Sequence, residues 1–197
     1  MLDVGANEGA FARRLRADGY DGRIVSFEPL AAAFALLERA AADDGDWRCL
    51  RVALGSETGT ATLNVSGNLA SSSFLPLAAE AEAAEPRTAY VGREEVEVTT
   101  LDALRADALG PGERALLKLD VQGLELEVLR GAERTLEQVH VVEAELSLAR
   151  LYEGAPLIGE VVGELDRRGY ALLALQPAFV HPRTGALLQL DGLFARA

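Results

Sequence analysis

The sequence predicts an α/β fold in which a mostly parallel sheet is covered by helices on both faces. Short apolar segments alternate along the chain with segments in which apolar residues recur every three or four positions. This alternation is typical of consecutive βαβ units. Because crossovers between parallel strands are right-handed, we expect a doubly wound sheet. The 197 residues are enough for one such domain with a substantial core.

Seven short apolar segments are the predicted strands of this sheet. They cover residues 1–4, 23–27, 48–54, 115–119, 139–146, 170–175 and 187–195. Strands that are buried on both faces of a parallel sheet have this short, apolar character.

Helical segments separate the predicted strands. Phe11 and Leu15 are one turn apart in the first helix, and Pro29 stands at the expected first position of the second. Residues 124–132 and 157–165 each repeat apolar side chains along one face. We therefore expect four helices that pack against the sheet.

One stretch interrupts the alternation. Residues 60–65 and 94–100 alternate polar and apolar side chains with the two-residue period of half-exposed strands, so we expect a hairpin-like ribbon. The connection between them, residues 66–92, has the length of a functional lid or a disordered loop. The sequence predicts a single domain over residues 1–197 with an insertion at about 58–100.

The composition narrows the partners of the chain. The formal net charge is −12 and no basic, aromatic stretch offsets it, so nucleic acid is not an expected partner. No apolar run is long enough to span a membrane, and no signal peptide is recognisable. Cys49 is the only cysteine, which excludes an internal disulfide and is typical of a reducing compartment. We expect a cytoplasmic protein.

The first predicted strand leads into a turn with two glycines, DVGANEG, at residues 3–9. Gly5 and Gly9 let the backbone approach a ligand closely, and the N–H groups at the start of the next helix favour an anion. The second predicted strand ends at Glu28, where a carboxylate can accept hydrogen bonds from both hydroxyls of a ribose. Together these features predict a nucleoside-type cofactor.

The turn discriminates between two such cofactors. A dinucleotide fingerprint reads G-x-G-x-x-G, whereas this turn has two glycines with Asn7 between them. Asp3 is placed to meet the ammonium of S-adenosylmethionine, directly or through water, while the helix start faces its carboxylate. A zwitterionic tail explains both Asp3 and the glycines, and a pyrophosphate explains only the glycines. A tight turn without a ligand is the remaining alternative.

A second motif, LLKLDVQGLELEVLRGAE, predicts a buried strand that ends at Asp120, a turn with Gly123 and a helix with Glu125. With this motif the chain resembles the FkbM family of S-adenosylmethionine-dependent methyltransferases. The other matching elements are DVGANEG, FEP, VALGSETGTATLNV, SSSF, TLDAL and DGLF, in the order of the family. The family usually has Glu where Gln122 stands, and it normally has residues before the first strand.

The resemblance implies a class I methyltransferase fold: Rossmann-like and doubly wound, with seven strands of which the last is antiparallel. It implies S-adenosyl-L-methionine as cofactor and a small-molecule acceptor, since most members methylate hydroxyls of sugars and secondary metabolites. The residues expected to contact the cofactor are Asp3, Gly5, Ala6, Asn7, Gly9, Phe27, Glu28, Pro29, Ala53, Leu54, Ser72 and Asp120.

An alcohol acceptor calls for a general base, and two carboxylates are candidates. Asp120, at the end of the fourth strand, is the first choice; an N-cap or a cofactor contact is its alternative role. Glu143, Glu145 and Ser147 share one face of the fifth strand, and Glu145 is nearer its carboxyl end. Glu145 is therefore the second candidate.

Other polar residues are weaker candidates. Glu125 could join the two base candidates around a divalent ion, but the spacing does not demand one and no metal is predicted. His181, in a late loop, is a further candidate for the base, and His140 has no assigned role. Ser71, Ser72 and Ser73 are candidates for contacts to cofactor or acceptor.

Two other functions are alternatives to methyl transfer. One is a nicotinamide-dependent oxidoreductase on a similar sheet, against which the missing third glycine argues. The other is a cofactor-binding module without catalysis, which Gln122 in place of the family's Glu makes plausible.

Overall fold

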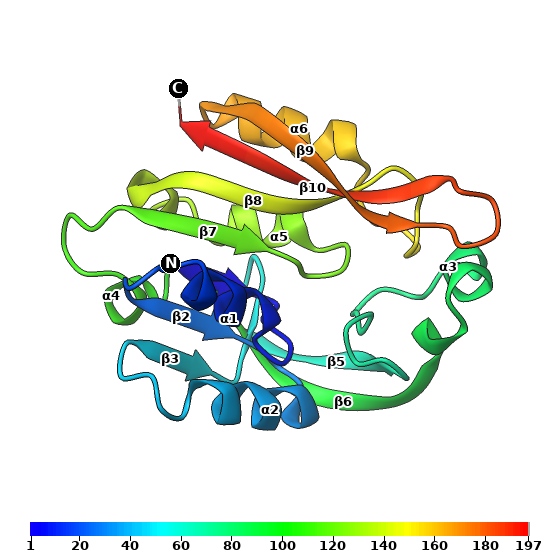
Figure 1. Cartoon of the computed structure of the whole chain (residues 1–197), viewed down its shortest axis with the longest axis horizontal. Helices are drawn as coiled ribbons and strands as arrows, with labels where there is room; N and C mark the ends of the chain where they lie inside the picture. The colour runs from blue at the N-terminus through cyan, green and yellow to red at the C-terminus, as the bar shows by residue number, and fades with distance from the viewer. Residues whose placement is uncertain (197) are drawn as a thin grey trace.

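The computed structural model describes residues 1–196 and contains the predicted seven-stranded sheet (Figure 1). The strand order is β3-β2-β1-β7-β8-β10-β9, and neighbouring strands are parallel except that β10 is antiparallel to both β8 and β9. The strands are β1 (Leu2–Val4), β2 (Ile24–Phe27), β3 (Trp47–Leu50), β7 (Ala115–Leu119), β8 (Val139–Ser147), β9 (Tyr170–Val180) and β10 (Leu187–Arg196). The order reverses between β1 and β7, so the predicted doubly wound sheet with an antiparallel last strand is confirmed.

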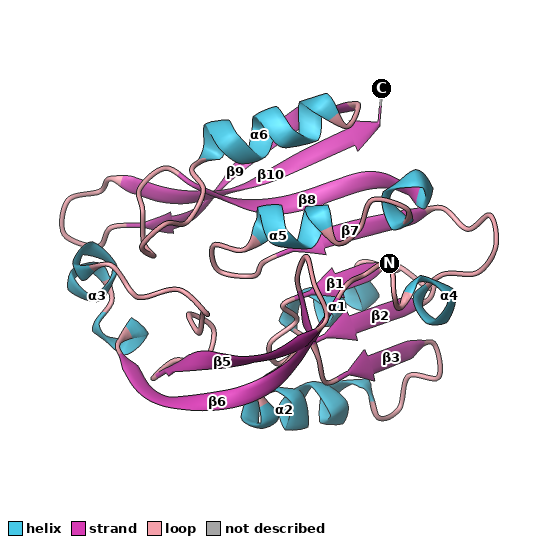
Figure 2. Cartoon of the chain, turned by 180° about the vertical axis from the view of Figure 1, so that it is seen from behind, coloured by secondary structure: helices cyan, strands magenta, loops and turns pink. Residues whose placement is uncertain are grey.

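Helices cover both faces of this sheet. α1 (Ala10–Ala17) and α2 (Ala31–Ala41) share one apolar cluster with Ile24 and Trp47. α5 (Glu125–Arg130) and α6 (Ile158–Arg167) contribute to the larger cluster on the opposite face, which Figure 2 shows turned toward the viewer. The short elements are α4 (Arg105–Ala108) and η2 (Thr135–Gln138). Within residues 1–196, no helix has the length and apolar character to cross a membrane.

A second sheet, of order β4-β6-β5, borders the first. β5 (Gly59–Ser66) and β6 (Tyr90–Thr99) are antiparallel, which confirms the predicted ribbon, and the connection between them contains α3 (Ala79–Ala84) and η1 (Pro86–Thr88). Figure 1 shows these elements beyond the carboxyl ends of β2 and β7. The insertion thus stands at the edge of the main sheet where ligands of α/β proteins bind.

The prediction of one continuous strand over residues 48–54 is wrong. β3 ends at Leu50, and β4 (Ala53–Leu54) pairs with β6 in the second sheet. The carbonyl of Leu50 accepts hydrogen bonds from the N–H groups of Val52 and Glu28, both at 3.1 Å. This local turn directs the chain out of the main sheet and toward the insertion.

The predicted start of the second helix is also wrong. Pro29 precedes α2, which begins at Ala31, and Leu30 is extended (φ −70°, ψ 128°). The N–H of Leu30 donates to Oε1 of Glu28 at 2.9 Å. The Glu28 carboxylate therefore holds these residues in an extended conformation before the helix starts.

Candidate active site

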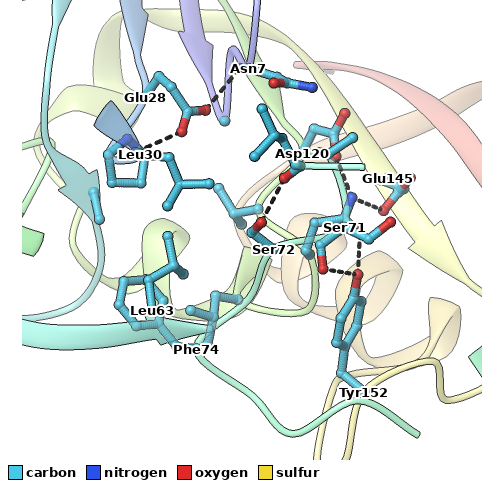
Figure 3. Close-up of a pocket in the computed structure, with 18 of the residues that line it drawn as sticks. Asn7, Glu28, Leu30, Leu63, Ser71, Ser72, Phe74, Asp120, Glu145 and Tyr152 are labelled. Atoms are coloured by element: carbon cyan, nitrogen blue, oxygen red, sulfur yellow. Dashed lines mark hydrogen bonds between the residues drawn. The ribbon is translucent and has the colours of Figure 1, made fainter. Parts of the chain in front are cut away.

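A cavity of about 400 Å³ lies at the carboxyl ends of the central strands and is closed on one side by the insertion (Figure 3). The predicted site residues that line it are Gly5, Asn7, Phe27, Glu28, Pro29, Ala53, Leu54, Ser71, Ser72, Asp120 and Glu145. Asp3, Ala6 and Gly9 are buried but do not line it. The structure therefore brings most of the predicted contact residues to one cavity, and these three lie in the protein interior outside its lining.

The turn after β1 is held by hydrogen bonds to β2. The N–H groups of Gly5 and Ala6 both donate to the carbonyl oxygen of Phe27 at 3.0 Å. Asn7 has a left-handed backbone (φ 46°), and its N–H donates to Oε2 of Glu28 at 2.9 Å. The turn therefore positions Glu28 in addition to presenting its own backbone to the cavity.

The two glycines of this turn have packing roles that the sequence analysis did not predict. A Cβ atom on Gly5 (φ 77°) would lie 1.9 Å from the carbonyl oxygen of Asp120. A Cβ atom on Gly9 (φ 79°) would lie 2.9 Å from side-chain atoms of Leu37 and Trp47. The fold itself requires both glycines. Only Gly5 has a cavity-lining position as well.

Glu28 is fixed by two backbone donors. Oε2 accepts from Asn7 and Oε1 accepts from Leu30, both at 2.9 Å. The residue is 6% exposed, and burial raises the pKa of its carboxyl group to about 7 despite these hydrogen bonds. Each carboxylate oxygen has a second lone pair, so Glu28 can accept two further hydrogen bonds from a ligand. The two hydroxyls of a ribose fit this requirement.

An apolar slot lies beside Glu28. The side chains that form it are Leu30, Val52, Ala53, Leu54, Leu63 and Phe74. Leu30, Ala53 and Leu63 belong to one buried cluster, against which Phe74 packs. A slot of this kind next to a carboxylate fits a flat ring joined to a ribose, as adenosine has.

Asp3 lies behind the cavity rather than in it. It is fully buried, and its Oδ2 accepts a hydrogen bond from the hydroxyl of Ser26 at 3.1 Å. Oδ1 has no hydrogen-bond partner, and Nζ of Lys118 lies 4.0 Å from it. Burial raises the pKa of the Asp3 carboxyl group. A direct contact between Asp3 and a cofactor ammonium has no support in this geometry.

The end of the cavity away from the slot contains two carboxylates joined by one amide (Figure 3). Nε2 of Gln122 donates to Oδ1 of Asp120 at 2.7 Å and to Oε2 of Glu145 at 3.0 Å. Nε2 of Gln189 donates to the same Glu145 oxygen at 2.6 Å. Within residues 1–196 no donor reaches Oε1 of Glu145, which leaves that oxygen for a ligand.

The two carboxylates have different surroundings. Burial, followed by the charges of Asp120 and Glu125, raises the pKa of Glu145 well above its usual range. Asp120 is paired with a cation, since Nζ of Lys118 lies 3.0 Å from its Oδ2. Burial opposes the charge of Lys118, but the carboxylates of Asp120 and Asp3 outweigh it and raise the pKa of the ammonium.

Hydrogen bonds tie this end of the cavity to the insertion. The hydroxyl of Tyr152 donates to Oε1 of Gln122 at 2.6 Å and lies 3.1 Å from the carbonyl oxygen of Ser71. The hydroxyl of Ser73 donates to the carbonyl oxygen of Gln122 at 2.7 Å. The insertion and the carboxylates are therefore parts of one polar network.

Three residues of this network were not predicted from the sequence: Lys118, Tyr152 and Gln189. Lys118 offered a signal, because it is the only lysine of the chain and stands two residues before Asp120 on a strand. Tyr152 and Gln189 lie in no motif, and only the fold brings them to the site.

The remaining polar candidates lie outside the cavity lining. Glu125 is buried, accepts from the N–H of Gly123 at 3.2 Å, and has a pKa raised to about 7 by burial. His181, in the loop between β9 and β10, accepts from the N–H of Arg183 at 3.2 Å through Nδ1. His140, on β8, has Nδ1 at 3.2 Å from the carbonyl oxygen of Gln138 at the end of η2. In the described part of the chain, no group of three or more His, Cys, Asp or Glu side chains could hold a metal ion.

Several solved structures share this fold at low sequence identity. Magnesium protoporphyrin IX methyltransferase from Synechocystis PCC 6803, solved with bound S-adenosylmethionine, has a TM-score of 0.54 and 10% identity over 100% of this chain and 69% of that one. Fibrillarin from Aeropyrum pernix, also solved with S-adenosylmethionine, has a TM-score of 0.54 and 12% identity over 98% and 65%. WbdD has a TM-score of 0.52 and 15% identity over 99% and 35%. The chain thus spans between 35% and 69% of the length of these proteins.

The comparison with protein families identifies the family of the chain, which similarity of fold alone does not show. No curated protein matches the chain. Residues 3–172 match the methyltransferase FkbM domain, and this range contains the turn after β1, Glu28, Asp120 and Glu145. Methyl transfer is thereby favoured over nicotinamide chemistry, and the predicted cofactor is confirmed. The chain belongs to the FkbM family of S-adenosylmethionine-dependent methyltransferases and has the class I methyltransferase fold.

Proposed function

We propose that the chain methylates a hydroxyl group of a small metabolite or sugar. The observation that carries this proposal is the pair of carboxylates, Asp120 and Glu145, at the end of the cavity away from the slot beside Glu28. The cofactor, when bound, supplies an electrophilic methyl group on a sulfonium. An alcohol is hard to deprotonate in advance, so a base that takes its proton as the new bond forms contributes roughly 10²–10⁴-fold.

The cofactor contacts that we propose follow from the cavity lining. Glu28 accepts from the ribose, the apolar slot holds the adenine, and the turn with Gly5 and Asn7 borders the amino-acid tail. The proposed contact residues are Gly5, Asn7, Phe27, Glu28, Pro29, Ala53, Leu54, Ser72 and Asp120. Asp3, Ala6 and Gly9 support the turn from behind.

We assign the role of general base to Glu145 rather than to Asp120, the first choice from the sequence. Both oxygens of Asp120 are engaged, one by Lys118 and one by Gln122. Glu145 has an oxygen without a donor, and burial raises its pKa, which makes its carboxylate a stronger proton acceptor than an ordinary one. Two carboxylates in contrasting surroundings commonly divide two roles in this way. Asp120 then orients the cofactor.

The charge of the cavity supports an acceptor without acidic groups. Within the described residues, its lining contains four carboxylates, Glu28, Glu85, Asp120 and Glu145, and no basic side chain. A phosphate or an RNA backbone would find no counter-charge there. A neutral polyol would instead donate its hydroxyl protons to these carboxylates.

The experiment is a transfer assay with cofactor labelled in its methyl group. Candidate acceptors are neutral polyols, their phosphate esters and an RNA of mixed sequence, and mass spectrometry locates the label. We expect label on an oxygen of a neutral polyol. Label on nitrogen or on RNA would contradict the proposal. Tight binding of S-adenosylhomocysteine without transfer to any acceptor would favour a cofactor-binding module instead.

A further inference from the structure

Gln122 lies where the two carboxylates, the insertion and the loop after β8 meet. We infer that Gln122 is a positioning residue that holds Asp120 and Glu145 in one arrangement and couples them to the insertion. The inference rests on the proposed function for its catalytic meaning. The hydrogen bonds that carry it do not depend on which molecule is methylated.

The amide of Gln122 supplies what two neighbouring carboxylates lack. Ionised carboxylates only accept hydrogen bonds, whereas an amide nitrogen has two hydrogens. Nε2 of Gln122 gives one to Asp120 at 2.7 Å and one to Glu145 at 3.0 Å. Hydrogen bonds to charged groups are the strong ones. One side chain therefore fixes both acids and reduces the cost of holding two like charges close together.

The orientation of this amide is set from the other side. Tyr152 is 3% exposed, and its hydroxyl donates to Oε1 of Gln122 at 2.6 Å. A flipped amide would turn its nitrogen toward Tyr152 and its oxygen toward two carboxylates, so that acceptors would face acceptors. The backbone of Gln122 has φ 52°, a strained region for a residue with a side chain, and the hydroxyl of Ser73 holds its carbonyl at 2.7 Å.

The contacts of Tyr152 and Ser73 extend the network into the insertion. The Tyr152 hydroxyl also lies 3.1 Å from the carbonyl oxygen of Ser71, and both serines belong to the connection between β5 and β6. A change in the position of that connection must therefore move Gln122 or break its hydrogen bonds. The carboxylates then respond to the state of the insertion through one side chain.

Glutamate at this position would reverse the effect. It has the same length as glutamine but replaces the donor nitrogen with an oxygen that is ionised near neutral pH. The new carboxyl group would lie within hydrogen-bond distance of both Asp120 and Glu145. Three neighbouring carboxyl groups cannot all ionise easily, so at least one takes up a proton. Glutamine thus leaves Glu145 able to accept a proton while Asp120 keeps its pairing with Lys118.

The charged and titratable groups around Glu145 define the background of any pH effect. They are Lys118 on β7, Asp120 after it, Glu125 on α5, Tyr152 after β8 and Asp191 on β10. A substitution at Gln122 replaces none of these side chains. A shift in the titration of Glu145 therefore reports the changed side chain at position 122 and its altered hydrogen bonds.

The test measures the carboxyl groups directly by NMR of the full chain labelled with carbon-13 at the side-chain carboxyls of Asp and Glu. Gln122→Glu should raise the pKa of Glu145 by about one to two pH units, the size expected when a donor to a charged group is replaced by a like charge. Gln122→Asn keeps an amide, tolerates the left-handed backbone and is too short to bridge. It should move the carboxyl resonances of both Asp120 and Glu145.

Gln189→Asn is the matched control, since Gln189 donates to Glu145 and to no atom of Asp120. It should move the Glu145 resonance and leave that of Asp120 in place. If Gln122→Asn moves only one resonance, or Gln122→Glu leaves the titration of Glu145 unchanged, the inference is wrong. These readouts need no acceptor, so a failed transfer assay would contradict the proposed function and leave the role of Gln122 to its own test.

Discussion

The ammonium of Lys118, the only lysine of the chain, lies 3.0 Å from Oδ2 of Asp120. It also lies 4.0 Å from Oδ1 of Asp3 and 5.3 Å from the centre of the Phe11 ring, and its side chain is 12% exposed. One cation therefore compensates two carboxylates, of which Asp3 is fully buried. Removing one partner of a buried ion pair is far more costly than the pair's net contribution.

Lys118→Met should lower the free energy of unfolding by about 3–5 kcal/mol near pH 8 and by less near pH 5. Lys118 has a raised pKa, so its stabilisation of the native protein is fully present below about pH 10 and is constant over this window. In the variant, Asp3 takes up a proton as the pH falls, because burial already raises its pKa. Urea unfolding at both pH values measures the difference. Lys118→Arg is the charge-retaining control, and an equal loss at both pH values would contradict the explanation.

Glu28→Gln should weaken the affinity for S-adenosylhomocysteine by about ten- to a hundredfold, the size of one lost hydrogen bond to a charged group. The affinity of the unmodified chain should rise from about pH 6 to about pH 8. The pKa of Glu28 is raised to about 7, so its carboxylate form, which we propose accepts from both ribose hydroxyls, is gained over this window.

Calorimetric titrations across this pH range test the Glu28 prediction. The variant should lack the pH dependence, and Glu133→Gln, an exposed position remote from the cavity lining, should behave like the unmodified chain. The same affinity in Glu28→Gln and in the unmodified chain would show that the ribose is held elsewhere.

The insertion should gain protection from amide exchange when ligand binds. Between β5 and β6, local hydrogen bonds hold the chain, such as the one from the N–H of Ser71 to Oδ1 of Asn68 at 2.9 Å. Two further hydrogen bonds tie it to the site, between Tyr152 and Ser71 and between Ser73 and Gln122. Such a segment opens locally at lower cost than a core strand. Exchange in residues 67–89 should slow with cofactor and acceptor, while residues 115–119 serve as the unchanged reference. Strong protection without ligand would make this segment a fixed part of the fold.

The sequence was sufficient for features that depend on local pattern. Apolar runs predicted the strands of the main sheet. The places of Glu28 and Asp120 at strand ends predicted that both lie at the carboxyl edge of the sheet, where they line the cavity. The break between β3 and β4 was not predictable, because it depends on hydrogen bonds from Glu28 and Val52 to one carbonyl. β9 extends to Val180, past the expected end at residue 175, because it pairs along most of β10.

Parts of the site escaped prediction because distant segments form them. Gln189 and Glu145 are 44 positions apart, and Tyr152 and Ser71 are 81 apart. No local periodicity records such contacts. We predicted that the glycines of the first turn let the backbone approach a ligand closely, but the atom that a Cβ on Gly5 would meet is a backbone oxygen of Asp120. Residue type was readable from the sequence, whereas the contacting partner was not.

The last prediction separates the two carboxylates. Glu145→Gln keeps an acceptor oxygen for Gln122 and Gln189 but loses the ability to take a proton, so turnover should fall by roughly 10²-fold or more. Affinity for S-adenosylhomocysteine should change by less than about tenfold, since no cofactor contact is proposed for Glu145. Asp120→Asn should show the opposite pattern. Its new amide nitrogen must face either the Lys118 ammonium or the Gln122 amide, both of which are donors.

Asp120→Asn should therefore lose cofactor affinity by about tenfold or more and retain most of its turnover at saturating cofactor. Steady-state kinetics with an identified acceptor, combined with calorimetry, measures both quantities for both variants. The double variant adds a check, because Asp120 and Glu145 share the Gln122 amide, and residues in one hydrogen-bond network have non-additive effects on the free energy of the transition state. The base is Asp120 if Asp120→Asn abolishes turnover with affinity preserved and Glu145→Gln leaves both turnover and affinity unchanged. In that case the donor-free oxygen of Glu145 serves to bind the acceptor instead.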